Sequence, residues 1–183
     1  EQGHTVVGTD LDAETLAELQ RRFEGQGATF QPADAANLAF PDNSFDVVFH
    51  NGLWVLFEDD DFIKRMLEEQ VRVARKYAVI IVHNADNPHL VSSFARRAEE
   101  DALYDIRFFN TEDVRALVDD SGVRYRKMGF LKFGGRMDLL YQKKRVKKIL
   151  PNIFWPVRHR AVPRLYQVEP WHKIERVACV LEL

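Results

Sequence analysis

Apolar positions along this chain follow two patterns that alternate. Short runs of β-branched and aromatic residues predict buried β-strands, and these runs lie at 4–10, 28–32, 45–49, 77–82, 123–130 and 176–183. Between the runs, apolar residues recur at helical spacing and predict helices, which lie at 13–24, 58–76, 90–102 and 112–120. Because the strands are too apolar to leave a face in water, we expect an α/β fold with a doubly wound, Rossmann-like sheet and helices on both faces.

Polar residues mark the ends of several predicted helices. Asp12 is placed to cap the first helix, and Thr111 is placed to cap the last one. The second helix starts with acidic residues and ends with the basic Arg75 and Lys76, an arrangement that the helix dipole favours.

Polar residues also follow four of the predicted strands: Asp10, Asp34, His50 with Asn51, and His83. In open α/β sheets, ligands bind beyond the carboxyl ends of the strands. We therefore expect these residues to share one rim of the sheet and to form the binding site.

Length and composition are those of one globular domain, which we place at 1–183. The chain has 183 residues, of which 46% are apolar and 30% are charged. Its longest uncharged apolar run, Tyr77–Val82, is much too short to cross a bilayer. The one cysteine, Cys179, allows neither an intrachain disulfide nor a cysteine cluster for a metal, so we expect a cytoplasmic protein.

Charge is distributed unevenly along the chain. Residues 1–120 hold 11 Lys and Arg against 24 Asp and Glu, whereas residues 121–183 hold 15 against 4. The basic C-terminal third fits an anionic partner, or simply complementary faces of one fold or of an oligomer. The acidic first part argues against nucleic acid lying across the rim, so we expect no nucleic-acid partner.

One stretch within the basic part predicts an amphipathic helix. Leu139, Val146 and Ile149 fall on one side of it, lysines fall largely on the other, and aromatic residues follow at 153–156. The pattern is typical of a peripheral membrane contact through 139–156, or of a helical lid that packs its apolar side on the sheet. We favour the lid.

Three stretches of the sequence match the order of motifs in a known family: Val6–Asp12, Ala33–Phe49 and Phe109–Val114. Over residues 3–130 they resemble the class I S-adenosylmethionine-dependent methyltransferases, in particular the small-molecule branch. The resemblance implies an enzyme that transfers a methyl group from S-adenosylmethionine to a small-molecule acceptor. It also implies a core at 1–130 and 176–183, with a basic, aromatic insertion at 131–175.

The resemblance assigns cofactor-binding residues as well. It places Asp10 on both ribose hydroxyls and Leu11 against the adenine face. It places Asp34 on the adenine amino group, the backbone amide of Ala35 near a ring nitrogen, and His50 along the cofactor pocket. The residue types fit, because hydroxyl and amino groups are donors and a carboxylate is a strong acceptor. Taken alone, Asp34 is equally typical of a turn.

Three residues are candidates for catalysis on the acceptor side: His50, Asn51 and His83. Methyl transfer needs alignment of acceptor, methyl group and sulfur, and a base where the acceptor carries a proton. Histidine titrates near neutral pH and suits that base, with Asp86 as an acid that could orient His83. For His50 we favour the alternative of a hydrogen-bonded or pocket-lining ring. The His, Asp and Cys spacings are not those of metal ligands, so no metal is expected.

The sequence departs from the family at its start. None of the nine glycines forms the G-x-G-x-G loop that follows the family's first strand and approaches the cofactor. In the family, that strand lies between those matched by 4–10 and 45–49, and without it two buried strands each lack a neighbour. We therefore expect a fragment of a longer protein, direct pairing of those two strands, or completion by another chain.

Two other functions stay open. One is a non-catalytic, methyltransferase-like module that binds a partner protein or an anionic surface through the basic residues 121–183. The other is a different Rossmann enzyme that binds NAD, which also places an acid where Asp10 lies. The stretch from Asp34 to Phe49 argues against the second.

Overall fold

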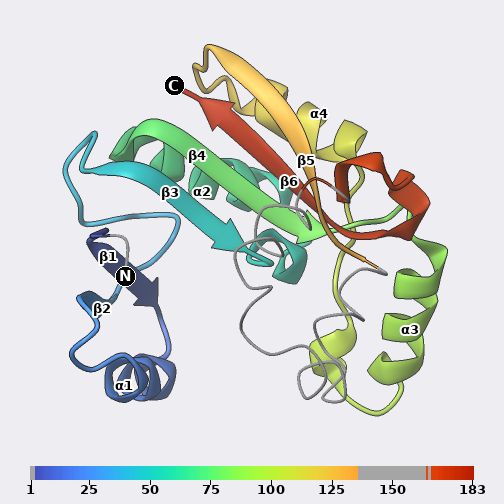
Figure 1. Ribbon diagram of the computed structural model, residues 1–183, viewed down its shortest axis with the longest axis horizontal. Coiled ribbons are helices and arrows are strands. Elements are labelled where there is room, and N and C mark those ends of the chain that lie inside the picture. The colour runs from blue at the N-terminus through green and yellow to red at the C-terminus, as the bar shows by residue number, and fades with distance from the viewer. Residues whose placement is uncertain (1–2, 136–163, 165) are drawn as a thin grey trace, which may run out of the picture.

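A computed structural model describes residues 3–135, 164 and 166–183 of the chain, which has an α/β architecture (Figure 1). The strands are β1 (Val6–Asp10), β2 (Ala28–Pro32), β3 (Phe45–Asn51), β4 (Ala74–His83), β5 (Lys127–Gly135) and β6 (Ile174–Glu182). The α-helices are α1 (Ala13–Arg22), α2 (Asp60–Val73), α3 (Pro88–Ala98) and α4 (Thr111–Ser121). Short 3-10 helices are η1 (Trp54–Leu56), η2 (Ala102–Tyr104) and η4 (Trp171–Lys173). The predicted α/β fold class is confirmed, and among the described helices none has the length and apolar character to cross a bilayer.

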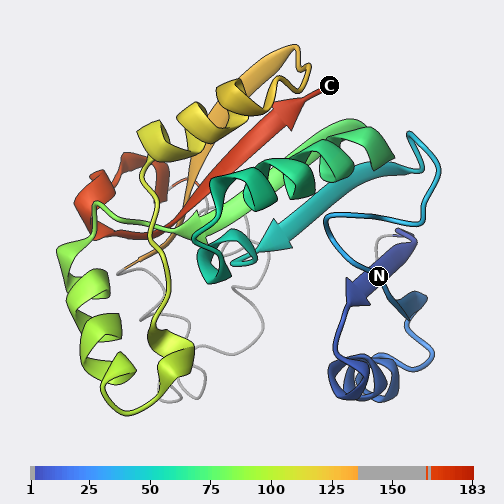
Figure 2. The same cartoon turned by 180° about the vertical axis from the view of Figure 1, so that it is seen from behind.

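The strands form two separate sheets within the described ranges. β1 pairs with β2 in parallel, and the larger sheet has the order β3, β4, β6, β5. β3 and β4 are parallel, whereas β6 is antiparallel to both of its neighbours. β1 and β3 do not pair in the part of the chain that is described, so the expectation of direct pairing is wrong. In both views β1, β2 and α1 lie beside the β3 edge of the larger sheet (Figure 1, Figure 2).

The core of the larger sheet lies on the face that α2 and α4 cover (Figure 2). Alternate residues of the two central strands point to this face and are buried: Ala78, Ile80, Val82, Val177, Cys179 and Leu181. Ile63 and Leu67 of α2 and Val114 and Val118 of α4 complete the cluster. The two-residue period of a strand thus sends every second apolar side chain into one core, where burial stabilises the sheet.

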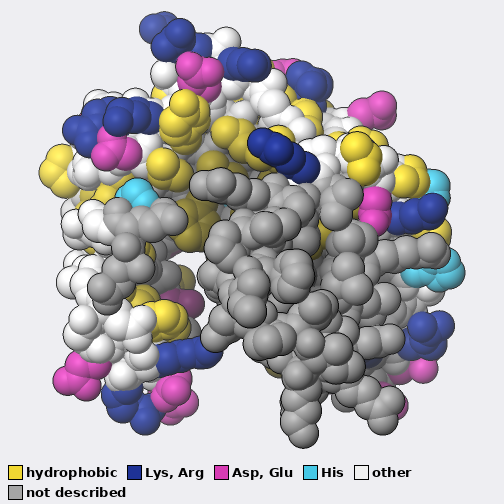
Figure 3. Space-filling view, in the orientation of Figure 1, with side chains coloured by type: hydrophobic (Ala, Val, Ile, Leu, Met, Phe, Trp, Pro, Cys, Tyr) yellow, Lys and Arg dark blue, Asp and Glu magenta, His cyan; other side chains and the backbone are white. Residues whose placement is uncertain are grey.

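The opposite face of the larger sheet is apolar but incompletely covered. Five large side chains on it are 39–65% exposed: Val47, Phe49, Tyr77, Leu131 and Phe133. Figure 3 shows this face, with hydrophobic side chains beside the atoms that are not described. α2 and α4 both lie on the other side, whereas α3 contacts this face at the end of β4, where the ring of Phe94 lies 5.1 Å from that of His83. Among the described residues, helices therefore cover this face only in part.

The N-terminal unit of β1, α1 and β2 has little core of its own. Asp12 caps α1 as predicted, and its side chain accepts from the amide of Thr15 at 2.7 Å. Leu16 is the one buried residue between positions 3 and 33. A two-stranded sheet is marginal by itself, so this unit depends on its attachment to the rest of the molecule.

The predicted end of the second helix is wrong. Arg75 and Lys76 belong to β4 and not to α2. Both side chains form ion pairs with Asp46 of the neighbouring β3, at 3.0 and 2.9 Å. These ion pairs form only when the two strands pair. The helix-dipole argument does not include them, and it therefore placed both residues in the helix.

The last helix cap and the last strands also differ from prediction. Asn110 caps α4 in a capping box with Asp113, and Thr111 is the first helical residue. β5 runs on to Gly135 and β6 begins at Ile174, so the predicted insertion at 131–175 begins and ends inside strands. The predicted amphipathic and aromatic segment, 139–156, lies outside the described residues.

We expect Leu67→Ala to lower the free energy of unfolding by about 2–5 kcal/mol, because it leaves a cavity beneath the sheet. The matched control is Leu103→Ala, whose side chain is 81% exposed. Its effect should stay within about 0.5 kcal/mol. Urea unfolding followed by circular dichroism measures both values, and equal effects would contradict the position of the core.

Candidate functional site

Asp10 and Asp34 lie close together at the carboxyl ends of the two parallel strands of the smaller sheet. Asp10 ends β1 and is in register with Pro32 of β2. The amide of Ala33 donates to the backbone carbonyl of Asp10 at 3.1 Å, which brings the chain that carries Asp34 beside β1. Parallel pairing therefore joins the two acids predicted to bind the cofactor.

Each of these carboxylates uses one oxygen in its own turn. Oδ1 of Asp10 accepts from the amide of Asp12, and Oδ1 of Asp34 accepts from the amide of Ala36, both at 2.9 Å. Both acids are exposed, and within the described ranges their Oδ2 atoms have no hydrogen-bond or ion-pair partner. The edge thus presents two fixed acceptors, which suits a ligand rich in hydrogen-bond donors.

The neighbours of the two acids are apolar and differ in exposure. Leu11 is 73% exposed and offers an apolar surface beside Asp10. Ala35 is half-buried and packs against the main core. The four residues predicted to bind the nucleoside therefore occur together in the structure.

His50 lies near the end of β3 on the face covered by α2, since it is in register with the buried Ile80. Its ring centroid is 5.5 Å from that of Trp54. Both ring nitrogens of His50 and Nε1 of Trp54 are buried with no hydrogen-bond partner among the described residues. Burial lowers the pKa of His50 to about 3, so the ring is neutral at pH 7.

His83 ends β4 on the opposite face, in register with Arg176 of β6. Its ring lies 5.1 Å from the ring of Phe94 and 6.1 Å from that of Phe108. Burial, and then the nearby guanidinium of Arg176, lowers the pKa of His83 to about 4. Its Nδ1 is buried without a partner among the described residues, and no hydrogen bond there joins Asp86 to the ring, so the expected pair does not form.

Asn51 and Arg176 meet at the same rim. Nη1 of Arg176 donates to Oδ1 of Asn51 at 2.5 Å. Gly52 follows with a φ of 83°, and a Cβ at this position would lie 3.9 Å from both Arg176 and His83. Sequence reasoning missed Arg176, because only the antiparallel pairing of β6 with β4 brings it to this rim and no local pattern indicates that pairing.

The predicted site residues thus form two groups. Residues 10–11 and 34–35 lie on the smaller sheet, and His50, Asn51 and His83 lie on the larger one. β1, β3 and β4 run in the same direction, so both groups lie at carboxyl ends (Figure 1). His50 and His83 point to opposite faces of the sheet and therefore do not act on each other.

An open depression of about 640 Å³ lies at the start of α3. It is lined by Asn87, Pro88, His89, Leu90, Ser93, Gly135, His172, Lys173 and Glu175. None of the predicted site residues lines it. In the part of the chain described here, no three His, Cys, Asp or Glu side chains are grouped to hold a metal ion.

Comparison with known proteins relates the first part of the chain to methyltransferases. Residues 1–82 match the family described as "Methyltransferase domain". The uncharacterized protein Rv1405c of Mycobacterium tuberculosis is 40% identical over 75 residues, which are 40% of this chain and 26% of that protein. The chain thus spans about a quarter of the length of the curated relatives it matches.

Solved structures extend the likeness to nearly the whole chain. A methyltransferase of Thermotoga maritima, described as a possible histamine N-methyltransferase, has a TM-score of 0.61 at 19% identity, over 96% of this chain and 72% of that one. Magnesium protoporphyrin IX methyltransferase of Synechocystis, with bound SAH, has a TM-score of 0.56 at 12% identity, over 99% and 65%. The chain has the fold of the class I S-adenosylmethionine-dependent methyltransferases.

The methyltransferase fold places both groups of residues on the side where ligands of such sheets bind. The methyltransferase fold that the sequence resemblance implied is confirmed. The matched region 1–82 contains Asp10, Asp34 and His50, whereas His83 and Arg176 lie beyond it. His83 ends β4, and the pairing of β6 with β4 brings Arg176 beside it.

The buried, neutral state of His50 makes the stability of the methyltransferase fold depend on pH. Its pKa is about 3 in the folded chain and 6.5 in an unperturbed ring, so the unfolded chain binds the proton first as the pH falls. The neutral ring of His50 therefore contributes fully to the free energy of unfolding above pH 6.5. This contribution is lost as the pH falls toward 3, by up to about 1.4 kcal/mol per pH unit.

We expect His50→Phe, which keeps a ring beside Trp54, to flatten the dependence of the unfolding free energy on pH between about pH 6 and pH 4. Urea unfolding at several pH values measures the slope. Trp54→Phe is the control, since neither ring titrates and the curve should shift equally at each pH. An unchanged slope in His50→Phe would contradict the buried, neutral histidine.

Proposed function

We propose that this protein is an S-adenosylmethionine-dependent methyltransferase that acts on a small-molecule acceptor. The pair of Asp10 and Asp34 carries the proposal. These are two fixed carboxylates, each with one oxygen uncommitted within the described residues, at the ends of neighbouring parallel strands in a methyltransferase fold. The structural likeness to an enzyme that holds SAH supports this cofactor.

The donors of an adenosine moiety match the acceptors of this edge. In the proposal, Asp10 accepts from the ribose hydroxyls and Asp34 accepts from the adenine amino group. Leu11 covers the adenine face, the amide of Ala35 approaches a ring nitrogen, and His50 lines the pocket. Charged acceptors make the stronger hydrogen bonds, and the exposed Leu11 supplies the apolar contact that a base needs.

His50, Asn51 and His83 are the proposed residues of the acceptor side. Burial keeps both histidines neutral at pH 7, because it lowers their pKa values to about 3 and about 4. A base with so low a pKa takes a proton only from an acidic group, so we assign these rings to orient the acceptor by hydrogen bonds. The bond from Arg176 to Asn51 supports a rigid rim.

The chain's own contribution to the reaction is alignment. When bound, the cofactor supplies an activated methyl group on a sulfonium. Residues 10–11 and 34–35 would hold the nucleoside end, and the rim of β3 and β4 would hold the acceptor in line with the methyl group. Alignment of this kind lowers the barrier because the cost of bringing the reactants together is met on binding.

We further propose that another β-strand pairs between β1 and β3. Each of these strands has one edge without a strand partner in the described residues. Open strand edges leave backbone N–H and C=O groups unpaired, and the N-terminal unit buries only Leu16 to offset this. A further segment of a longer protein, or another chain, would supply the strand.

Binding of S-adenosylhomocysteine to the full-length protein tests the nucleoside site. Asp10→Asn replaces a charged acceptor by a neutral one, so we expect the Kd to rise about 10- to 100-fold. Isothermal titration calorimetry measures this change. Asp120→Asn is the matched control, an exposed acid of α4, and should leave the Kd within about twofold.

Two further results separate the rival functions. Binding that NAD abolishes by competition would favour a different Rossmann enzyme. Absence of cofactor binding, together with salt-sensitive binding to a protein or to anionic vesicles, would overturn the enzyme and support a non-catalytic module.

A further inference from the structure

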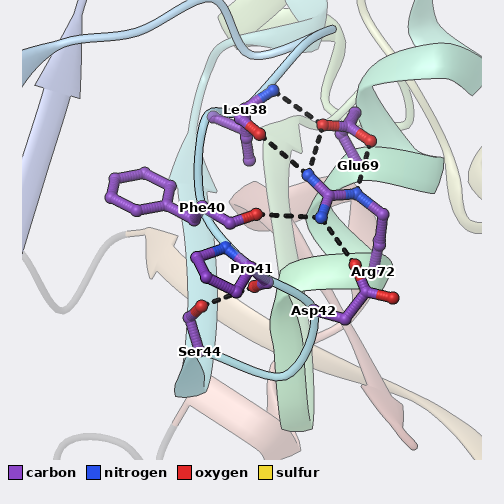
Figure 4. Close-up of polar contacts among 7 residues, drawn as sticks. All are labelled: Leu38, Phe40, Pro41, Asp42, Ser44, Glu69 and Arg72. Atoms are coloured by element: carbon purple, nitrogen blue, oxygen red, sulfur yellow. Dashed lines mark hydrogen bonds and ion pairs between the residues drawn. The ribbon is translucent and has the colours of Figure 1, made fainter.

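The loop between β2 and β3 carries Asp34. Farther along this loop, Arg72 of α2 forms hydrogen bonds with Leu38, Phe40 and Asp42 (Figure 4). Arg72 donates from Nη2 to the carbonyl of Leu38 at 2.8 Å and from Nη1 to the carbonyl of Phe40 at 2.9 Å. Nη1 also donates to Oδ1 of Asp42 at 2.7 Å. A single guanidinium thus fixes three points of the loop.

Glu69, one turn earlier on α2, completes this arrangement. Its Oε2 accepts from the amide of Leu38 at 2.7 Å and from Nη2 of Arg72 at 2.8 Å, while Oε1 accepts from Nε of Arg72 at 2.7 Å. The Glu69 side chain is 19% exposed and that of Arg72 is 32% exposed. The guanidinium lowers the pKa of Glu69, so both partners stay charged at neutral pH. We call Glu69 and Arg72 the loop clamp.

The loop clamp lies close to the nucleoside-binding acid along the chain. From Leu38 the chain runs back through a tight turn, in which the amide of Asn37 donates to the carbonyl of Asp34 at 3.0 Å. The amide of Ala36 binds the Asp34 carboxylate itself at 2.9 Å. A movement of Leu38 would therefore be transmitted to the carboxylate of Asp34.

Strand pairing does not supply this link. The smaller sheet shares no strand hydrogen bonds with the larger one in the described ranges. The clamped loop is what connects β2 to β3, and the amide of Asn43 adds a bond to the carbonyl of Arg72 at 2.9 Å. The position of Asp34 relative to the rim of β3 consequently depends on α2.

We propose that Glu69 and Arg72 are positioning residues of the nucleoside site, which set the place of Asp34 relative to the rim. The inference rests on the proposed function and extends it to residues that do not touch the cofactor. Loss of the loop clamp weakens cofactor binding while the fold of the larger sheet persists.

An arginine suits this position for a geometric reason. Its planar guanidinium presents five N–H donors in fixed directions, and here these donors reach two carbonyls and two carboxylates at once. A lysine keeps the charge but offers one ammonium group, which cannot span these acceptors. Arg72→Lys therefore separates loop geometry from charge.

Hydrogen exchange in the full-length protein tests the hold on the loop without any ligand. In Arg72→Lys we expect amides of residues 34–43 to exchange about 10-fold faster or more, with β4 and β6 unchanged. Arg75→Lys is the matched control, because Arg75 pairs with Asp46 of β3 and does not touch the loop. Glu69→Gln serves as a second variant should Arg72→Lys fail to fold. Unchanged exchange in the loop would overturn the inference.

Calorimetry with S-adenosylhomocysteine tests the link to binding. We expect the Kd of Arg72→Lys to rise about 10-fold, and that of Glu69→Gln to rise about threefold. Arg75→Lys, whose side chain pairs with Asp46 of β3, should keep the wild-type Kd. A wild-type Kd in a variant with a loosened loop would overturn this inference alone. Absence of binding by the wild-type protein would overturn the proposed function. Hydrogen exchange would still show whether Glu69 and Arg72 hold the loop in place.

Discussion

Parallel pairing of β1 with β2 is the interaction on which the proposed nucleoside site depends. It brings the ends of two strands, separated in sequence by the helix α1, to one edge, and each strand delivers an aspartate there. The local turns then fix each carboxylate through one oxygen and leave the other uncommitted within the described residues. The backbone turns fix the positions of both carboxylates, so this pair of acceptors needs no large cavity to hold it.

Attachment of this edge to the larger sheet combines polar contacts with limited apolar packing, since Ala35 and Ala36 lie against the core of the larger sheet. The N-terminal unit buries one residue, Leu16, whereas the larger sheet buries a full cluster under α2 and α4. Glu69 and Arg72 bridge the two parts through the loop between β2 and β3. Charged groups that are half-buried and fully hydrogen-bonded give a defined geometry, which apolar packing alone would not give to a half-buried loop.

Much of this arrangement was predictable from local patterns. Hydrophobic period and residue chemistry were enough to predict the strand at 28–32, the cap at Asp12 and the acids after the first two strands. The structure has these features where they were expected. Whether His83 would pair with Asp86 was not predictable, because a gap of two residues after a strand does not fix side-chain directions, and the described residues show no such bond. Arg75 and Lys76 were assigned to a helix, because their partner Asp46 lies on another strand.

The sequence by itself determined the elements and the types of residue at their ends, because strand and helix periods and capping are local properties. Tertiary structure alone decided the rest. It placed His50 and His83 on opposite faces, made both neutral by burial, and brought Arg176 to Asn51 from the far end of the chain. Burial and long-range strand pairing depend on every neighbour in space, and no window of sequence contains those neighbours.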